Sequence, residues 1–308
     1  MAEPWSTRVA YFNGKIVPEG QVLIPFRDRS FRLGDGCFDM TRTFAGHVFR
    51  LEEHVDRLYR SLAYLRIVPG LGPEEMISIT QEVVARNELL RPAAGDWWVA
   101  QRISRGVDAL GDEGWEHTGP QVIVDCTPLP LKARARLFRD GVDVMVPSGR
   151  RAGPSVLSPR AKTHNYLNLI LADKEVKARN PEAWSVLLDE NGNLCEGIGS
   201  NIFLVRGGRL STPRERYVLP GVSRQMVIDL ARESGVPCEE KDLDVYDGMT
   251  ADEAFLTSTS LCVCPVRSLN GKLIGAGRVP GPITRRLTDA YCAHVGLDFV
   301  AQYLRHLG

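Results

Sequence analysis

The sequence predicts an α+β protein of two domains. Its 308 residues are enough for two hydrophobic cores. Strand-like and helix-like segments follow one another without the regular βαβ alternation of a doubly wound sheet. The stretch TPLPLKARAR, near 127–134, is punctuated by prolines and then basic, which is typical of a linker. We therefore expect a small N-terminal α/β domain over 1–127, a linker over 128–134 and a large C-terminal domain over 135–308.

The predicted N-terminal domain opens with a hairpin, because the strand-like runs VAYF and KIVP flank the turn signal Asn13-Gly14. In the strand that follows, Phe38, Met40 and Arg42 share one face by alternation. The further elements expected here are helices over 51–65 and 73–90 and strands in WWVAQRISRG and PQVIVDCTPL, with the Gly- and acid-rich loop 106–119 between these strands.

The predicted C-terminal domain mixes strands and helices along the chain. Its expected elements are a strand in GVDVMVPS, a helix over 164–179, strands in WSVLLD and NIFLVRGGRLST, a helix over 221–234, a strand in DEAFLTST and a helix near 281–294. In LCVCPV, the two-residue spacing places Cys262 and Cys264 on one face of a strand. No second Cys or His pair completes a zinc pattern, so we expect buried free thiols and no metal.

The charge balance argues against two classes of partner. Lysine plus arginine equals aspartate plus glutamate at 38 each, so nothing attracts nucleic acid or an anionic membrane over long range. The N-terminus lacks the layout of a secretory signal, and no apolar run approaches the roughly 20 residues that span a bilayer. Seven cysteines without a framework spacing favour a reducing compartment. We expect a cytoplasmic protein.

Three segments carry residues that suit one cofactor. Lys162 follows a proline-containing loop in SPRAKTHNYLNLILA and precedes a helix start, where a ligand can reach its amine. Glu196 sits in a glycine-rich turn of LLDENGNLCEGIGSNIFLV, and LPGVSRQMVIDLA is a loop that enters a helix. A reactive amine, a carboxylate and an anion-binding helix start together suit pyridoxal phosphate. The amine would form the Schiff base, the carboxylate would keep the ring nitrogen protonated, and the helix start would bind the phosphate.

The motifs RLGDGCFD, RLEEHVDRL, AKTHNYLN, LCEGIGSN, LPGVSR and TSTS followed by CPVRSLNG occur in this order. In combination they resemble the fold-type IV pyridoxal-phosphate enzymes, from the YFNGKIVP hairpin to the GPITRRL stretch. That family contains branched-chain aminotransferases, D-amino-acid aminotransferases, (R)-selective amine transaminases and aminodeoxychorismate lyase. The resemblance implies a two-domain α+β fold of the D-amino-acid aminotransferase type and a homodimer with active sites at the subunit interface.

The resemblance also implies a role for each matching residue. Lys162 is the Schiff-base lysine and the catalytic acid and base, with a solvated surface lysine as the alternative. Glu196 faces the ring nitrogen, or else caps backbone amides in its turn. Arg57 binds the phosphate, or else pairs with Glu53 one helical turn away. The remaining cofactor contacts implied are Val222 and Ser223 at the helix start, the hydroxyl of Thr259 and the phenol of Tyr166.

Helical spacing is the basis of two expectations around Lys162. Tyr166 lies four residues, about one turn, beyond the lysine, so both side chains would face the same way. The alternative for Tyr166 is a tyrosine on a core face. His164 would diverge from Lys162 on a helix and is therefore expected to be structural.

The substrate pocket is predicted on the strand face that carries Phe38. We expect Arg42 to bind the substrate carboxylate there, with an internal salt bridge to a nearby acid as the alternative. Arg102 and Arg105 are further candidates for the same task. The full set of substrate-binding candidates is Phe31, Phe38, Met40, Arg42, Trp98 and Arg102.

The signals for a subfamily conflict. Phe38 followed by Arg42 reproduces a pattern of the branched-chain enzymes, but Trp98-Val99-Ala100 replaces the Tyr-X-Arg that they tend to carry. No Arg-X-His pair follows SRG, unlike in similar D-amino-acid aminotransferases. Leu33 replaces a histidine of some (R)-amine transaminases, whereas GPITRRLTDAY leans toward that group. The sequence leaves the amino donor open.

We therefore predict a pyridoxal-phosphate aminotransferase. It would move the amino group of an amino acid or a primary amine to a keto acid, 2-oxoglutarate or pyruvate, in a ping-pong cycle. One rival is a lyase of the aminodeoxychorismate type, which would eliminate pyruvate without a keto-acid acceptor. Another is a cofactor-free binding protein in which Lys162 and Glu196 form an ion pair.

Overall fold

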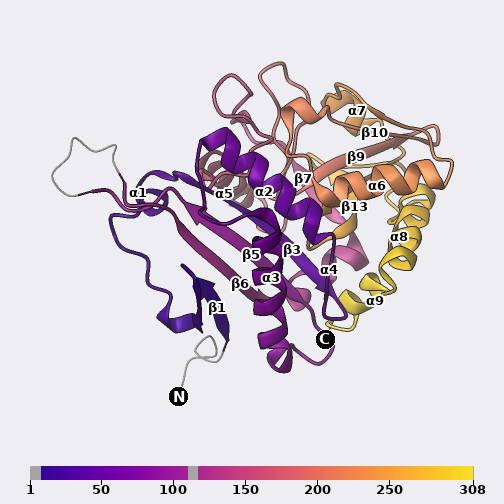
Figure 1. Ribbon diagram of the computed structural model, residues 1–308. Coiled ribbons are helices and arrows are strands. Elements are labelled where there is room, and N and C mark those ends of the chain that lie inside the picture. Colours follow the sequence, from indigo (N-terminus) through magenta and orange to yellow (C-terminus); the bar gives the residue numbers. More distant parts are fainter. Residues whose placement is uncertain (1–7, 110–116, 308) are drawn as a thin grey trace. The chain divides into compact units, whose positions relative to one another are not determined.

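The computed structural model describes residues 8–109 and 117–307, so the middle of the predicted loop 106–119 lies outside the described residues. The chain forms two compact units (Figure 1). Unit 1 comprises Met1–Leu129 together with Ala161–Asn165, and unit 2 comprises Pro130–Arg160 and Tyr166–Gly308. The short segment that carries Lys162 therefore packs with unit 1, although its neighbours in sequence pack with unit 2.

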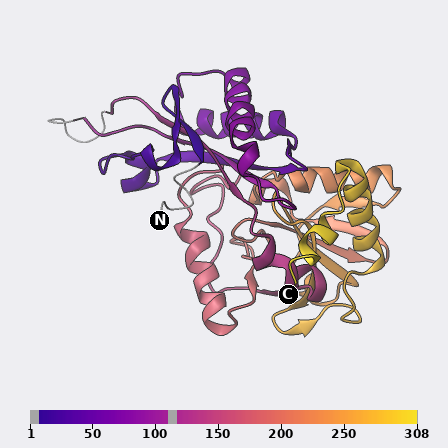
Figure 2. The same ribbon diagram turned by 90° about the horizontal axis from the view of Figure 1, so that it is seen from below.

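Unit 1 is built on one antiparallel sheet of six strands in the order β2-β1-β6-β5-β3-β4. The strands are β1 (Val9–Phe12), β2 (Lys15–Pro18), β3 (Gly36–Phe44), β4 (His47–Val48), β5 (Trp97–Ser104) and β6 (Gln121–Pro128). Helices α2 (Leu51–Leu65) and α3 (Pro73–Asn87) lie on the same side of this sheet (Figure 2). The predicted hairpin and the helix over 51–65 are confirmed.

The core of unit 1 lies between the two helices and the sheet. Apolar side chains on one stripe of α2 are buried because they recur at helical spacing: Leu51, Val55, Leu58 and Leu62. The predicted second helix ends as α3 at Asn87 and continues as a short 3-10 helix, η3 (Glu88–Leu90). A short helix α1 (Arg29–Leu33) was not predicted; the Asp28 side chain caps it by accepting from the backbone amides of Ser30 and Phe31.

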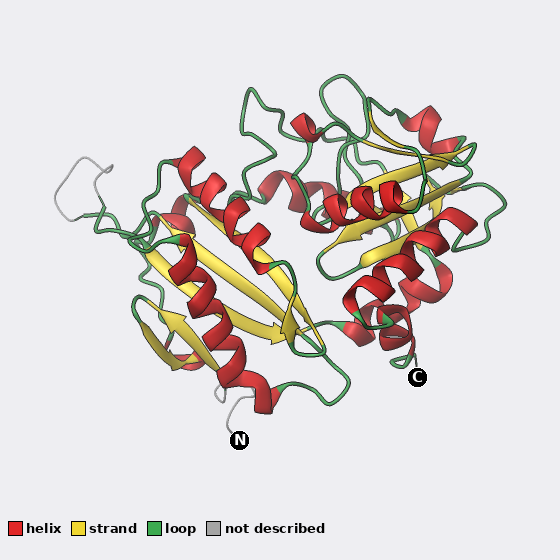
Figure 3. Ribbon diagram, turned by 45° about the vertical axis from the view of Figure 1, so that its right-hand side comes forward, coloured by secondary structure: helices red, strands yellow, loops and turns green. Residues whose placement is uncertain are grey.

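Unit 2 contains an eight-stranded mixed sheet in the order β11-β10-β9-β12-β13-β7-β8, with β14 paired to β13. Figure 3 draws the strands in yellow and the helices in red. Its strands are β7 (Val142–Met145), β8 (Trp184–Ser185), β9 (Asn201–Arg206), β10 (Arg209–Thr212), β11 (Cys238–Glu240), β12 (Glu253–Ser258), β13 (Cys262–Leu269) and β14 (Lys272–Leu273). Its helices are α4 (Leu131–Asp140), α5 (Leu167–Arg179), α6 (Val222–Glu233), α7 (Val245–Met249), α8 (Pro282–Val295) and α9 (Phe299–Leu304).

Two sequence expectations about local structure in this half of the chain are wrong. The segment taken as a linker is helical from Leu131, because Leu131, Ala135 and Phe138 form a buried stripe that the prolines obscure. The helix expected over 164–179 begins only at Leu167, since the residues before it are held by strand-like backbone pairing. The short helix α9 was not predicted, and the helix near 281–294 is confirmed as α8.

Cys262 and Cys264 are buried in β13, and all seven cysteines are free thiols, as expected for the pair. Burial raises the pKa of the Cys264 thiol above its ordinary value. Within residues 8–109 and 117–307, the helices are too short or too polar to cross a bilayer.

Candidate active site

Lys162 is held by its backbone against the start of β3. The Phe38 amide donates to the Lys162 carbonyl at 3.0 Å, and the His164 amide donates to the Gly36 carbonyl at 2.8 Å. The Lys162 amide itself donates to Ser61 Oγ on α2 at 3.1 Å. The segment around Lys162 thus pairs with β3 like a short strand and is not helical. The expectation that Lys162 and Tyr166 face the same way because they are one helical turn apart is therefore wrong.

The Lys162 amine lies over an aromatic ring. Its Nζ is 4.7 Å from the centre of the Phe38 ring. The same ring stacks on His164, with centroids 5.4 Å apart, and has the Arg102 guanidinium 5.8 Å from its centre. Neighbouring Asp39 bonds to residues of α2, so alternation along β3 points Phe38 to the face opposite the helices. The amine therefore lies on the face of the unit 1 sheet opposite the helices.

His164 is a neutral side chain near neutral pH. Burial, with help from the nearby Arg102 charge, lowers the pKa of His164 to about 4. Its Nδ1 forms a hydrogen bond with Ser30 Oγ. A Cβ at Gly36 would lie 2.7 Å from this Nδ1 and 2.6 Å from the Ile103 carbonyl, so only glycine fits there. His164 is structural as expected, but through stacking and not through divergence on a helix.

Arg57 lies buried on α2 in an ionic cluster. Its Nε and one Nη each donate to the Asp39 carboxylate at 2.8 Å, and His54 Nδ1 lies 2.7 Å from the same carboxylate. Burial opposes the charge of Asp39, but Arg57 and His54 outweigh it and hold the pKa of that carboxyl well below its usual range. Glu53 pairs with Arg50 at 3.1 Å, so the Glu53 alternative for Arg57 is wrong. Its phosphate contact stays a prediction.

Arg42 has an internal partner. Its side chain is 1% exposed, its Nη2 lies 3.4 Å from an Asp96 oxygen, and its guanidinium lies 4.0 Å from the centre of the Phe44 ring. A buried arginine needs such a counter-ion. The alternative of an internal salt bridge is therefore the one found, and the expectation that Arg42 reads the substrate carboxylate is wrong.

The other substrate candidates lie on three elements of unit 1. Met40 follows Phe38 on the same face of β3 and is half-buried. On the neighbouring strand β5, Trp98 is paired with Arg42 and Arg102 with Phe38. Phe31 lies on α1 with 74% of its surface exposed. The Arg102 guanidinium and the Lys162 amine thus both lie near the Phe38 ring, whereas Phe31 is largely exposed on α1.

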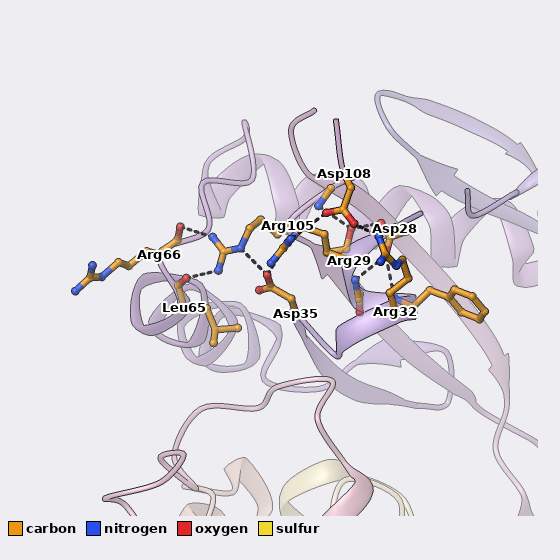
Figure 4. A network of polar contacts seen from close by, with 12 residues as sticks. Asp28, Arg29, Arg32, Asp35, Leu65, Arg66, Arg105 and Asp108 are labelled. Carbon is orange, nitrogen blue, oxygen red and sulfur yellow. Dashed lines mark hydrogen bonds and ion pairs between the residues drawn. The ribbon is translucent and has the colours of Figure 1, made fainter. Parts of the chain in front are cut away.

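Arg105, the further candidate for the substrate carboxylate, has structural partners of its own (Figure 4). It pairs with Asp35 at 2.8 Å and donates to carbonyls at the end of α2. Asp35 also pairs with Arg29 at 3.0 Å, and Arg29 pairs with Asp108 at 2.9 Å. Arg105 is thereby engaged structurally.

Glu196 in unit 2 is fixed through both carboxylate oxygens. Arg151 Nε donates to Oε1 at 2.9 Å, and the Leu219 amide donates to Oε2 at 2.8 Å. The residue is 4% exposed. Each carboxylate oxygen can accept two hydrogen bonds, so with respect to the described residues one acceptor position on each remains for a further donor. A pyridinium N–H is a donor of that kind, and the site fits it.

The start of α6 has features that suit an anion. Gly221 has no side-chain cap, and a Cβ there would lie 2.2 Å from Asn201 Oδ1, so the backbone approaches as only glycine allows. Within the described residues, the buried hydroxyls of Ser200 and Thr257, at the neighbouring ends of β9 and β12, have no hydrogen-bond partner. Helix amides and orphaned hydroxyls suit the acceptor oxygens of a phosphate.

The remaining cofactor candidates of unit 2 lie on its element ends. Val222 and Ser223 are the first two residues of α6 and both are buried. Thr259 directly follows β12. Tyr166 directly precedes α5, makes no capping hydrogen bond with its side chain, and packs against the buried cluster of Leu169, Ala172 and Leu187. Tyr166 is thus partly buried against a hydrophobic cluster, which agrees in part with the alternative of a tyrosine on a core face. Its contact with the cofactor stays a prediction.

Three residues that organise the site were missed from the sequence. Ser61 belongs to no recognisable sequence motif. It does lie on the buried side of the amphipathic helix α2, so its burial could have been predicted. Asp39 is the neighbour of Phe38 on β3, so the two side chains point to opposite faces and Asp39 faces α2. Arg57 and His54 lie three residues apart on α2, a spacing that puts both on the same side of the helix. Arg151 gave no signal, because its contact with Glu196 spans 45 residues of irregular chain.

Comparisons of the sequence and of the fold with known proteins identify the family of this chain. The family described as Amino-transferase class IV matches residues 36–269. A putative branched-chain-amino-acid aminotransferase of Methanocaldococcus jannaschii is 36% identical over 282 residues, covering 91% of this chain and 94% of the relative. The crystal structure of the Escherichia coli branched-chain amino acid aminotransferase superposes with a TM-score of 0.85 at 30% identity, covering 93% of this chain and 94% of that chain.

A third match bears on the cofactor. The branched-chain amino acid aminotransferase of T.th., complexed with N-(5'-phosphopyridoxyl)-L-glutamate, superposes with a TM-score of 0.83 at 28% identity, covering 94% of each chain. A cofactor-free binding protein, one of the rivals considered from the sequence, is therefore wrong. This chain belongs to the class IV aminotransferases, which are pyridoxal-phosphate-dependent transaminases that pass amino groups between amino acids and keto acids.

Proposed function

We propose that this chain transfers the amino group of a branched-chain amino acid to a keto acid such as 2-oxoglutarate. The observation that carries the proposal is the Phe38 ring, 4.7 Å from the Lys162 amine, with Met40 next along the same strand face. An apolar surface beside the reacting group favours an aliphatic side chain. The names of the relatives from Methanocaldococcus jannaschii and Escherichia coli support the same donor class.

The residues assigned to pyridoxal phosphate divide into four tasks. Lys162 would hold it covalently, Glu196 would accept from its ring nitrogen, and Tyr166 would donate to its phenolic oxygen. The phosphate would be bound by Arg57, Val222, Ser223 and Thr259. When bound, the cofactor supplies an electron-accepting ring that stabilises the negative charge left when a proton leaves the substrate's α-carbon.

Within this scheme the chain's own residues move one proton. The Lys162 amine would take the proton from the substrate's α-carbon as a base and return it as an acid. The Lys162 backbone is held by hydrogen bonds to the Phe38 amide and to Ser61 Oγ, so the flexible four-carbon side chain would be the part that moves. Arg151 and the Leu219 amide would hold the Glu196 carboxylate in one orientation throughout the cycle.

A panel of donors against acceptors tests the proposed substrate. We expect leucine, valine or isoleucine with 2-oxoglutarate to give the highest kcat/KM, measured for both enantiomers of each donor. Highest activity with D-alanine or with one enantiomer of an aryl-alkyl amine would replace the branched-chain assignment. Release of pyruvate without any keto-acid acceptor would instead support the lyase.

We also propose that the chain forms a homodimer. Unit 1 exposes a run of large apolar side chains between β2 and β3: Leu23, Phe26, Phe31 and Leu33, with exposed fractions of 74%, 77%, 74% and 53%. Gathered exposed apolar groups favour association with another surface. Light scattering should give the dimer mass, and Phe26→Asp should shift it toward the monomer. The control Leu89→Asp, at a residue 99% exposed elsewhere on unit 1, should leave the mass unchanged.

The cytoplasm is the compartment that we propose. All seven cysteines are free, and a reducing compartment keeps thiols in that state. Cell fractionation against cytoplasmic and exported marker proteins tests this, and recovery with the exported marker would contradict it.

A further inference from the structure

Four buried aromatic side chains lie together between α4, α8 and α9 of unit 2 (Figure 1). The Phe138 ring stacks on the Tyr303 ring with centroids 4.2 Å apart, and it meets the Phe299 ring edge-on at 6.2 Å. The Tyr291 ring meets Phe299 edge-on at 5.6 Å. These four side chains make up the aromatic cluster. Rings packed in this way favour particular mutual orientations, so each holds its neighbours in place.

The two tyrosine hydroxyls of the aromatic cluster reach two different elements. Tyr303 donates to the backbone carbonyl of Ser260, in the turn between β12 and β13. Tyr291 donates to Ser223 Oγ, in the first turn of α6, over 3.4 Å. Ser260 is next to Thr259, and both Ser223 and Thr259 are assigned to the cofactor phosphate. The aromatic cluster thus contacts the two elements of unit 2 on which that assignment depends.

The Tyr291 hydrogen bond decides what Ser223 can offer a ligand. A hydroxyl has one hydrogen to donate and two lone pairs that accept. Because Ser223 Oγ accepts from Tyr291, its own hydrogen stays available for another acceptor. The oxygens of an ionised phosphate are strong acceptors and need donors. Tyr291 therefore leaves Ser223 oriented as a donor of the kind that a phosphate requires.

The turn between β12 and β13 depends on contacts from two helices. Tyr303 of α9 donates to the Ser260 carbonyl, and Arg134 of α4 donates to Ser260 Oγ. Directly after this turn, Cys262 has a φ of +57°, a left-handed conformation that few residues other than glycine adopt. Such a backbone persists only where the surrounding contacts determine it. The position of Thr259, in the same turn, therefore depends on α4 and α9.

Helix α8, which carries Tyr291, is anchored to the strand that leads into this turn. Glu253 is the first residue of β12, and its carboxylate accepts from the Ile283 and Thr284 amides at 2.9 Å and 2.8 Å. A carboxylate at a helix N-terminus satisfies amides that have no partner within the helix. Tyr291 is thus presented to α6 from a helix that has a fixed place on β12.

We propose that Tyr291 and Tyr303 are positioning residues for the cofactor phosphate, acting through Ser223 and through the turn that carries Thr259. The aromatic cluster packs the two tyrosines into one group, so a single set of side chains supports both phosphate-binding elements. This inference rests on the proposed function, because it assumes that Ser223 and Thr259 bind the phosphate. It adds the C-terminal helices α8 and α9 to the support of that site.

The test compares two ligands of the full-length chain freed of cofactor: pyridoxal phosphate, and pyridoxal, which lacks the phosphate. Fluorescence titration gives the Kd of each. Tyr303→Phe should weaken binding of pyridoxal phosphate by about three- to tenfold, the worth of one hydrogen bond, and that of pyridoxal by less than about twofold. Tyr291→Phe should act in the same direction but less, because a bond of 3.4 Å is long. The double variant should lower the preference for pyridoxal phosphate by about tenfold.

The control separates the hydroxyl from the ring. Each tyrosine-to-phenylalanine change keeps the ring and so leaves the aromatic cluster packed. Tyr246→Phe is the matched control, because Tyr246 lies on α7 of the same unit and is 66% exposed; it should change neither Kd. The ³¹P chemical shift of bound pyridoxal phosphate should move in Tyr303→Phe and stay unchanged in Tyr246→Phe.

Three results would overturn the inference: equal weakening of both ligands in Tyr303→Phe, no weakening of either in the double variant, or a wild type that binds pyridoxal as tightly as pyridoxal phosphate. Equal weakening would show that the Tyr303 hydroxyl supports the fold as a whole. A wild type that prefers pyridoxal phosphate and shows the tyrosine effects, yet transaminates no branched-chain amino acid, would contradict the proposed function and leave this inference standing.

Discussion

The Lys162 segment of unit 1 and the Glu196 turn of unit 2 fix their functional residues in opposite ways. At Lys162 the protein holds the backbone, through hydrogen bonds to the Phe38 amide and to Ser61 Oγ, while the long side chain reaches over an aromatic ring. At Glu196 the protein holds the side chain, with one donor on each carboxylate oxygen. The difference suits the proposed chemistry, in which Lys162 would carry a proton and so must move, whereas Glu196 would stabilise a fixed charge and so must not.

The largest expected effect is at the moving residue. Lys162→Ala should lower kcat by about a thousandfold or more, because positioned proton transfer alone contributes roughly 10²–10⁴. Lys162→Arg should be equally inactive, since a guanidinium stays protonated and cannot hold the cofactor. Steady-state rates and circular dichroism check this together. Substantial activity in a folded Lys162→Ala protein would contradict the assignment.

The next effect is at the fixed residue. Glu196→Gln should keep the bound cofactor but slow turnover about ten- to a hundredfold, the worth of a charged hydrogen bond. Arg151→Met should have a smaller effect in the same direction, because it removes an orienting donor and leaves the carboxylate. Stopped-flow rates of the half-reaction measure both. If Arg151→Met were the slower enzyme, the order of roles assigned to these two residues would be wrong.

Cofactor retention is expected to separate Arg57 from its helix neighbours. Arg57→Ala should weaken cofactor binding by about ten- to a hundredfold, as the loss of a charged hydrogen bond predicts. Arg60→Ala is the matched control, since Arg60 lies on the same helix, is 63% exposed and pairs with Asp56. Cofactor remaining after dialysis is read by absorbance. Equal retention in both variants would leave Arg57 as a structural partner of Asp39.

The smallest effect concerns pH. His164 has a pKa of about 4 in the folded protein, below the ordinary 6.5, so the unfolded chain takes up the proton first as pH falls. The stability from neutral His164 is therefore present above pH 6.5 and lost between pH 6.5 and pH 4. Denaturant unfolding of His164→Asn should show a weaker loss over that window. An unchanged slope would place the titrating group elsewhere.

Much of the fold was accessible from periodicity, and its failures have local causes. The helices at Leu51–Leu65 and Pro282–Val295 and the hairpin at Asn13-Gly14 carried their own signals. Helix α4 was hidden because prolines at 128 and 130 suggested a linker, whereas burial of Leu131, Ala135 and Phe138 was decided by contacts in unit 2. Propensity is local, and tertiary packing overrides it.

The site divided in the same way. Motifs led to the prediction of Lys162, Glu196 and the start of α6 as cofactor-binding positions, because the proposed chemistry depends on residue type and order, and these roles stay predictions. Arg42 was misassigned, since its partner Asp96 lies 54 residues away and no pattern links them.

The central claim is that Lys162 is the residue that holds the cofactor, and chemical trapping tests it most directly. Holoenzyme would be reduced with borohydride, digested and mapped by mass spectrometry. We expect a phosphopyridoxyl group on the peptide that contains Lys162 and on no other lysine. A label on another lysine, with Lys162 unmodified, would contradict the claim.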